Sequence, residues 1–351
     1  MNTDPQLIDA TRRIYTELGS PWPPTEKRNN KLWKTLEDSG LTLAWCPEAL
    51  GGAGGAVGDG LTIIGITGEF WDPAPVTETL LAGWLLSKAA ITIPKGPLSL
   101  LVSQPASKIK VDENGKISGR AEKVPFAASS KHLAALVEPP SGTGHQVAIL
   151  KTADASILPG HNVAAEPRDS VSLSEVEPLA LVDPLPALNP SSVLLLGALA
   201  RSIQMTHAIS AVLNMCIEYA QQRPAFGRPI SKFQSIQHYL AVIAGEYASA
   251  LAITAAAEES FIQDSQIGKT NIISLASAKV RVGEAANRVC ALSHQIHGAM
   301  GFTEEYTLHL FTHRLWSWRN DFGNEATWAT EIGKLVAKLG PEGLWHKLTT
   351  Y

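Results

Sequence analysis

Cysteine, charge and long apolar runs are all scarce in this sequence of 351 residues. The three cysteines, Cys46, Cys216 and Cys290, are widely spaced and odd in number. Such spacing gives neither a disulfide framework nor the ligand pattern of a metal site, so we expect free thiols and no bound metal. Cys216 and Cys290 lie in apolar helical patterns and are expected to be buried.

Charged residues make up 18% of the sequence, and the formal net charge is −4. Proteins that bind nucleic acid carry a basic patch, and none is evident here, so we predict no nucleic-acid partner. No uninterrupted apolar run reaches the ~18 residues of a membrane span, which predicts no membrane segment. The stretch Met1–Arg13 lacks the apolar core of a signal peptide, so we expect a cytoplasmic protein. A mitochondrial matrix protein without its transit peptide would leave the same pattern.

Periodicity divides the chain into three regions. Residues 1–93 show helical patterns, residues 94–186 show short strands separated by turn residues, and residues 187–351 show long apolar helices. We therefore predict an N-terminal α-helical domain, a small middle β domain and a C-terminal four-helix bundle with these boundaries. The expected helices span residues 4–18, 27–39, 61–70, 77–90, 191–220, 231–263, 270–298 and 327–338. The expected strands span residues 109–111, 116–118, 133–137, 147–150 and 170–173.

The stretch Tyr219–Ala241 carries the strongest local signal. A helix is expected to end near Arg223, because the residue before a proline is pushed out of helical conformation. A turn over Phe226–Pro229 follows, and a new helix is expected to start near Ser231. The arginine before this turn and Gln234 after it form a donor cluster suited to a bridging phosphate.

Two motifs resemble the acyl-CoA dehydrogenase family. The segment from Arg223 to Gln234 is similar to the one by which a subunit of that family holds the pyrophosphate of its neighbour's FAD. The stretch Gln295–Thr303 reads QIHGAMGFT and resembles the family's loop at the adenosine half of FAD. The resemblance covers nearly the whole chain, strongly at the C-terminus and weakly in the middle. It implies FAD-binding roles for Arg223, Phe226, Phe233, Gln234, Gln295, Gly298 and Ala299.

The sequence departs from the family at the catalytic base. The family's usual glutamate lies in a loop about 20 residues past the second motif, and Gly323 stands at that position here. Some members carry the glutamate early in the first helix of the C-terminal domain, where Ser191 is the best match. Neither residue is a carboxylate, so we assign no catalytic residue to this chain.

The middle region departs from the family as well. In the family's frame, a tryptophan beside the flavin ring and a threonine at its N5 edge correspond here to Lys123 and Pro125. A second flavin-facing loop matches Val102–Ser107 but has lost its acidic and glycine positions. A flavin ring needs a flat wall and hydrogen-bond donors. We expect the flavin-ring side of this chain to be degenerate.

The resemblance implies a subunit of a heteromeric FAD-dependent acyl-CoA dehydrogenase, of the α2β2 type associated with steroid side-chain degradation. Its partners would be a dehydrogenase subunit carrying the catalytic glutamate, an acyl-CoA substrate and an electron-transfer flavoprotein. One alternative is a self-sufficient homotetramer with a displaced base such as Glu325 or Asp321. Another is a flavin-free scaffold or binding protein.

Overall fold

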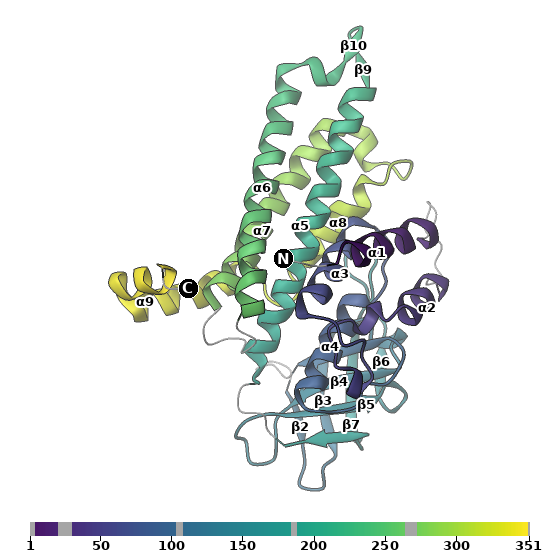
Figure 1. Ribbon diagram of the computed structural model, residues 1–351, viewed down its shortest axis with the longest axis vertical. Helices are drawn as coiled ribbons and strands as arrows, with labels where there is room; N and C mark the ends of the chain where they lie inside the picture. Colours follow the sequence, from purple (N-terminus) through teal and green to yellow (C-terminus); the bar gives the residue numbers. More distant parts are fainter. Residues whose placement is uncertain (1–3, 20–29, 103–107, 184–187, 264–271, 350–351) are drawn as a thin grey trace.

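Helices occupy both ends of the chain and strands its middle in the computed structural model, which describes residues 4–19, 30–102, 108–183, 188–263 and 272–349. This order confirms the predicted fold class (Figure 1). The strands end with Ala180–Val182 and the long helices begin at Pro190, while the domain boundaries themselves stay a prediction.

The N-terminal helices are α1 (Pro5–Leu18), α2 (Asn30–Asp38), α3 (Val57–Glu69) and α4 (Val76–Lys88). Asp4 caps α1, because its carboxylate accepts a hydrogen bond from the backbone NH of Gln6 at 2.9 Å. Helix α3 starts four residues before the predicted position. Asp59 closes its first turn by accepting from the backbone NH of Ala56 at 2.9 Å.

The middle strands are β1 (Leu98–Val102), β2 (Ile109–Val111), β3 (Ile117–Pro125), β4 (His132–Val137), β5 (Gln146–Lys151), β6 (Ser156–Leu158), β7 (Arg168–Val176) and β8 (Ala180–Val182). They form two four-stranded sheets, with orders β1-β4-β5-β8 and β2-β3-β7-β6. Leu133 and Ala135 of β4 face the core between the sheets, whereas Ala134 and Leu136 face the helices. Strands β1, β6 and β8 were not predicted; β1 is apolar on both faces and therefore lacks the alternation that marks a strand.

The C-terminal helices are α5 (Pro190–Gln222), α6 (Gln234–Gln263), α7 (Ile272–His297), α8 (Leu308–Trp318) and α9 (Glu325–Thr349). Asn189 caps α5 by accepting from the backbone NH of Ser192 at 2.9 Å. The prediction that α6 starts near Ser231 was wrong, because a 3₁₀ turn covers Ile230–Lys232 and Phe233 is extended. Helix α8 was not predicted. Helix α9 runs beyond the predicted end through a kink at Gly340, and Figure 1 shows it standing away from the bundle.

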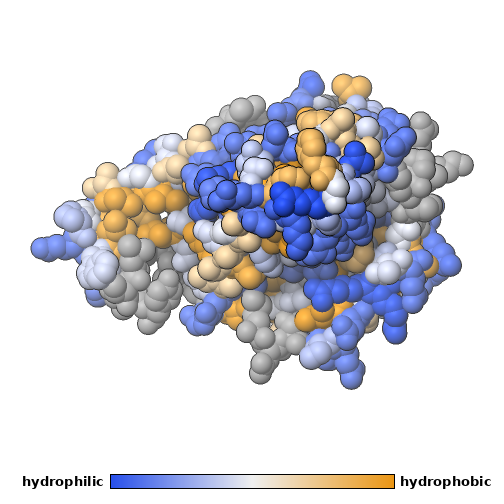
Figure 2. Space-filling model, turned by 90° about the horizontal axis from the view of Figure 1, so that it is seen from above, coloured by the Kyte–Doolittle hydropathy of each residue, from blue (hydrophilic) through white to orange (hydrophobic). Residues whose placement is uncertain are grey.

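Two bundle helices differ in how far they are covered. By length and composition, α5 and α6 could each cross a membrane, a test that core helices of soluble proteins also pass. The apolar window of α5 is 89% buried, whereas that of α6 is only 28% buried. Figure 2 shows hydrophobic surface on the end of the molecule that it views and over the protruding α9. All three cysteines are buried and free, as expected for Cys216 and Cys290.

Candidate functional site

The connection between α5 and α6 is a tight hairpin. Strands β9 (Pro224–Ala225) and β10 (Arg228–Pro229) pair antiparallel, and the backbone NH of Ile230 donates to the carbonyl of Arg223 at 2.9 Å. The two turn residues, Phe226 and Gly227, have φ angles of +50° and +77°. Two successive left-handed residues match the twist of a two-residue hairpin, and a glycine at the second position suits this turn. The hairpin fixes where the chain reverses at the end of the bundle (Figure 1).

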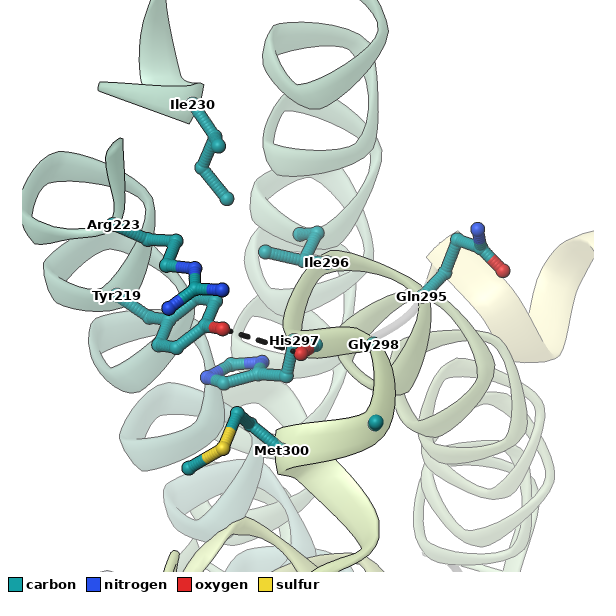
Figure 3. Close-up of a pocket in the computed structure, with 9 residues that line it drawn as sticks. Tyr219, Arg223, Ile230, Gln295, Ile296, His297, Gly298 and Met300 are labelled. Carbon is teal, nitrogen blue, oxygen red and sulfur yellow. Dashed lines mark hydrogen bonds between the residues drawn. The ribbon is translucent and has the colours of Figure 1, made fainter. Parts of the chain in front are cut away.

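Arg223 and the loop after α7 meet in a pocket of about 310 Å³ (Figure 3). The residues that line it are Tyr219, Arg223, Ile230, Gln295, Ile296, His297, Gly298, Ala299 and Met300. Arg223 is exposed, and its side chain has no hydrogen bond or ion pair with any residue that the structure describes. Gly298 has a left-handed φ of +58°, and a Cβ added there would have no atom within 4 Å. The pocket thus contains a guanidinium that pairs with no described residue, next to the accessible backbone of Gly298.

Tyr219 and His297 form the wall of this pocket, and the sequence analysis assigned an FAD-contacting role to neither of them. The Tyr219 hydroxyl donates to the His297 carbonyl at 3.3 Å, and the two rings stack with centroids 4.3 Å apart. His297 Nδ1 lies 2.8 Å from the carbonyl of Ser293, which can only accept, so Nδ1 carries the proton. Burial lowers the pKa of His297, which favours the neutral ring. The contact joins the end of α5 to the end of α7.

The structure splits the predicted FAD-contacting residues into two groups. Arg223, Gln295, Gly298 and Ala299 line the pocket. The other three predicted residues, Phe226, Phe233 and Gln234, lie at the hairpin and the start of α6, outside that lining. Phe226 is 97% exposed and meets Phe233 edge to face at 6.1 Å. The Phe226 ring is therefore almost fully accessible to solvent.

The strand predicted to face a flavin ring is irregular. The register of β3 against β7 shifts between Ala121 and Val124, and Lys123 within this bulge is exposed with a φ of +57°. Pro125 is buried and pairs in register with Arg168 of β7. Of the other predicted flavin-facing loop, residues 103–107 lie outside the described part of the chain.

The loop that matches the family's catalytic-base loop is tightly packed in this chain. Gly323 has a φ of +92°, and a Cβ added there would lie 2.7 Å from the indole nitrogen of Trp328. That indole donates to the Phe322 carbonyl at 3.0 Å, and the fully buried Lys279 ammonium donates to the Gly323 carbonyl at 2.8 Å. Burial lowers the pKa of Lys279 to about 8. No room remains for a side chain at this position.

The structure also shows the surroundings of the other residues that were considered as base positions. Ser191 lies exposed in the first turn of α5. Glu325, the displaced base of the homotetramer alternative, accepts from the Arg319 guanidinium at 2.5 Å. Asp321 is held by two arginines: its carboxylate lies 2.6 Å from Arg168 and 3.0 Å from Arg201.

Asp321 belongs to a line of six side chains of alternating charge that sequence reasoning did not find; five of them are buried and Asp321 is partly buried. In order they are Glu78 of α4, Arg201 of α5, Asp321 after α8, Arg168 of β7, Glu166 before β7 and Arg314 of α8. Successive contacts measure 2.6, 3.0, 2.6, 3.1 and 2.9 Å. We call this set the ion-pair line. Its three carboxylates and three guanidiniums balance.

Aromatic rings and hydrogen bonds enclose the ion-pair line. The Trp318 indole donates to Glu166 at 3.0 Å, and the Arg314 guanidinium lies 4.3 Å from the Trp318 ring centroid. Burial alone would raise the pKa of Glu166, but Arg314, Arg168 and Arg201 lower it to about 2. Burial likewise opposes ionisation of Asp321, and the same two arginines, Arg168 and Arg201, lower its pKa overall.

Comparison with known proteins shows which family this chain resembles. Residues 191–320 match the acyl-CoA dehydrogenase C-terminal domain. The acyl-CoA dehydrogenase IpdE2 of Mycobacterium tuberculosis is 27% identical over 287 residues, which are 82% of this chain and 80% of that protein. This match and this similarity confirm the resemblance to the acyl-CoA dehydrogenase family that was seen in the sequence, and the family is one of flavoprotein oxidoreductases.

Solved structures of the acyl-CoA dehydrogenase family share the fold over almost the whole chain. The ChsE4–ChsE5 complex from Mycobacterium tuberculosis superposes with a TM-score of 0.85 and 18% identity, covering 97% of this chain and 99% of that one. A structure described as a Tcur3481–Tcur3483 steroid ACAD G363A variant gives a TM-score of 0.83 and 21% identity, covering 95% and 97%. At these identities the likeness shows the fold alone.

The residues present fit one end of the family's FAD and not the other. At the pocket, an unpaired guanidinium and open glycine backbone suit a pyrophosphate and the adenosine beside it. At the flavin-ring end, β3 offers a bulge and a proline, and the ion-pair line crosses from β7 to the loop of Gly323. The ring end therefore does not match the group.

Proposed function

We propose that this chain is a subunit of a heteromeric FAD-dependent acyl-CoA dehydrogenase. It would bind the phosphates and adenosine of an FAD whose flavin ring lies in a partner subunit. The partner subunit would also supply the catalytic base. The reaction would be α,β-desaturation of an acyl-CoA thioester with a bulky, steroid side-chain type of acyl group. We further propose a cytoplasmic location and an electron-transfer flavoprotein as the electron acceptor.

The pocket carries this proposal. Arg223 has a planar guanidinium suited to two hydrogen bonds with a phosphate, and no described residue neutralises it. Gln295 lies exposed at the opposite rim, with Gly298 between them (Figure 3). When bound, FAD supplies the hydride acceptor of the desaturation. This chain would contribute binding and orientation, and Gly323 and Ser191 leave it without a proton acceptor at either base position.

Two exposed apolar surfaces support a partner subunit. One is the ring of Phe226 at the hairpin. The other is a row of small exposed residues on α6, which lets another helix approach closely. Its members are Ala241, Ala244, Gly245, Ala248, Ala252 and Ala255. One similar solved structure is described as the ChsE4–ChsE5 complex, and the description of another joins two names, Tcur3481 and Tcur3483; an assembly of two different chains is what we propose here.

The alternatives are less well supported by the contacts. A displaced base at Glu325 would first have to leave Arg319, and Asp321 would have to leave both Arg168 and Arg201. Withdrawing Asp321 would remove a partner from two buried guanidiniums, and breaking such a buried ion pair costs about 3–5 kcal/mol. A flavin-free scaffold would have no chemical use for an unpaired Arg223 beside an open glycine. Yellow, active protein obtained from this chain alone would establish the homotetramer instead.

The test is co-expression with an acyl-CoA dehydrogenase encoded beside this chain, followed by pull-down and a flavin count. We expect a stable complex that releases FAD when Arg223→Ala is introduced. Arg13→Ala is the matched control, because Arg13 is an exposed arginine on α1 and does not line the pocket. Full flavin retention in the Arg223→Ala complex would exclude the proposed clamp.

A further inference from the structure

The ion-pair line passes next to Pro125, the residue that the family's sequence frame puts at the edge of a flavin ring. On one side lies Pro125, which stands at the position of the residue at the ring's N5 edge and pairs in register with Arg168. On the other side lies the loop of Gly323, whose Asp321 carboxylate is 2.6 Å from the Arg168 guanidinium. A planar ring needs about 3.5 Å of clearance on each face. Groups in direct contact leave no such gap.

Aromatic side chains pack against the ion-pair line from the helix side. Phe322 packs directly on α5, since a Cβ added to Gly197 would lie 2.3 Å from the Phe322 ring. The Arg201 guanidinium lies 5.5 Å from the Trp318 ring centroid and 5.7 Å from that of Phe322. These contacts cover the arginine that holds both Glu78 and Asp321.

We infer that the ion-pair line permanently replaces a flavin ring in this chain, so that the protein folds without a ring of its own and admits none. Opening the space would separate charges that are buried together and leave them unpaired, which is strongly destabilising. The six charges sum to zero, so the closed arrangement needs no counter-ion from outside. This inference does not depend on the phosphate clamp at Arg223.

Riboflavin and ADP separate the two questions, because riboflavin has the ring without a pyrophosphate or adenosine, and ADP has those groups without the ring. With the unaltered full chain, we expect riboflavin to keep the fluorescence of the free compound and to leave the thermal unfolding midpoint unchanged. Stoichiometric riboflavin binding with quenched fluorescence would overturn the inference. Failure of ADP to bind would count against the clamp and leave the inference standing.

A variant tests the structural role of the line. We expect Asp321→Asn to lower the unfolding midpoint by several degrees, with no recovery on adding riboflavin. The matched control is Asp38→Asn, which removes an exposed aspartate paired with Lys34 at 2.8 Å and should leave the midpoint almost unchanged. Recovery of the Asp321→Asn protein by riboflavin, or equal effects of the two substitutions, would refute the inference. In the complex with a partner, a count of two flavins per pair of chains would also refute the inference.

Discussion

Restoring a glutamate at the family's base position should damage this protein and leave it inactive. Gly323 has a left-handed φ of +92°, a conformation that costs a residue with a Cβ about 1–2 kcal/mol. The added Cβ would also lie 2.7 Å from the Trp328 indole nitrogen, and overpacking of this kind costs about 1–3 kcal/mol. We therefore expect Gly323→Glu to lose about 2–5 kcal/mol of unfolding free energy and to gain no dehydrogenase activity.

Urea denaturation and acyl-CoA-dependent dye reduction measure these two outcomes. Gly323→Ala should lose nearly as much stability, because the backbone strain and the clash both begin at Cβ. Gly115→Ala isolates the backbone contribution, since Gly115 has a φ of +81° with no atom within 4 Å of an added Cβ. The reasoning fails if Gly323→Glu unfolds at the urea concentration of the unaltered protein, or if it oxidises an acyl-CoA without a partner.

Three further outcomes follow from individual contacts. The pKa of Glu166 is about 2 in the folded state against 4.5 ordinarily, so its stabilisation is complete above pH 4.5 and is lost as the pH falls toward 2. Denaturant titrations over that range should show a loss on the order of 3 kcal/mol, and a flat profile would contradict the assignment. Phe226→Ala should leave folding intact but weaken assembly with a partner about 30-fold, measured by titration calorimetry, as expected if the exposed ring is an interface anchor worth about 2 kcal/mol. Asn189→Ala should cost about 1 kcal/mol by removing the cap of α5, and Asn189→Asp should keep most of it in the same urea assay.

Local signals predicted much of the fold, and the family resemblance predicted that Arg223, Gln295, Gly298 and Ala299 belong to one site. The break at Arg223 was predictable because a proline acts on the residue directly before it. The approach of Arg223 to Gln295 came from the family resemblance, since α5 and α7 meet only in the folded bundle. Helix α8 was missed because Thr312, Arg314 and Ser317 are polar residues on its buried side, which obscures the apolar period.

Other features could not be read from the sequence in physical terms. Each member of the ion-pair line looks by itself like an ordinary surface charge, and the contacts join residues as distant as Glu78 and Arg201. The bulge at Lys123 depends on the register of two strands. Phe226 was predicted to contact FAD. In the structure its ring is exposed to solvent, because Phe226 is a turn residue of the hairpin with a left-handed φ.

The ion-pair line also couples the three regions of the chain during folding. The N-terminal helices contribute Glu78 with one negative charge, and the middle strands contribute a balanced pair of Glu166 and Arg168. The C-terminal bundle contributes one net positive charge, from Arg201, Arg314 and Asp321. Neither the N-terminal helices nor the C-terminal bundle can bury its share alone without leaving an unpaired charge in a dry interior. The chain should therefore unfold in one cooperative transition. In a partly folded species, the residues of the ion-pair line should stay hydrated until all three regions pack together.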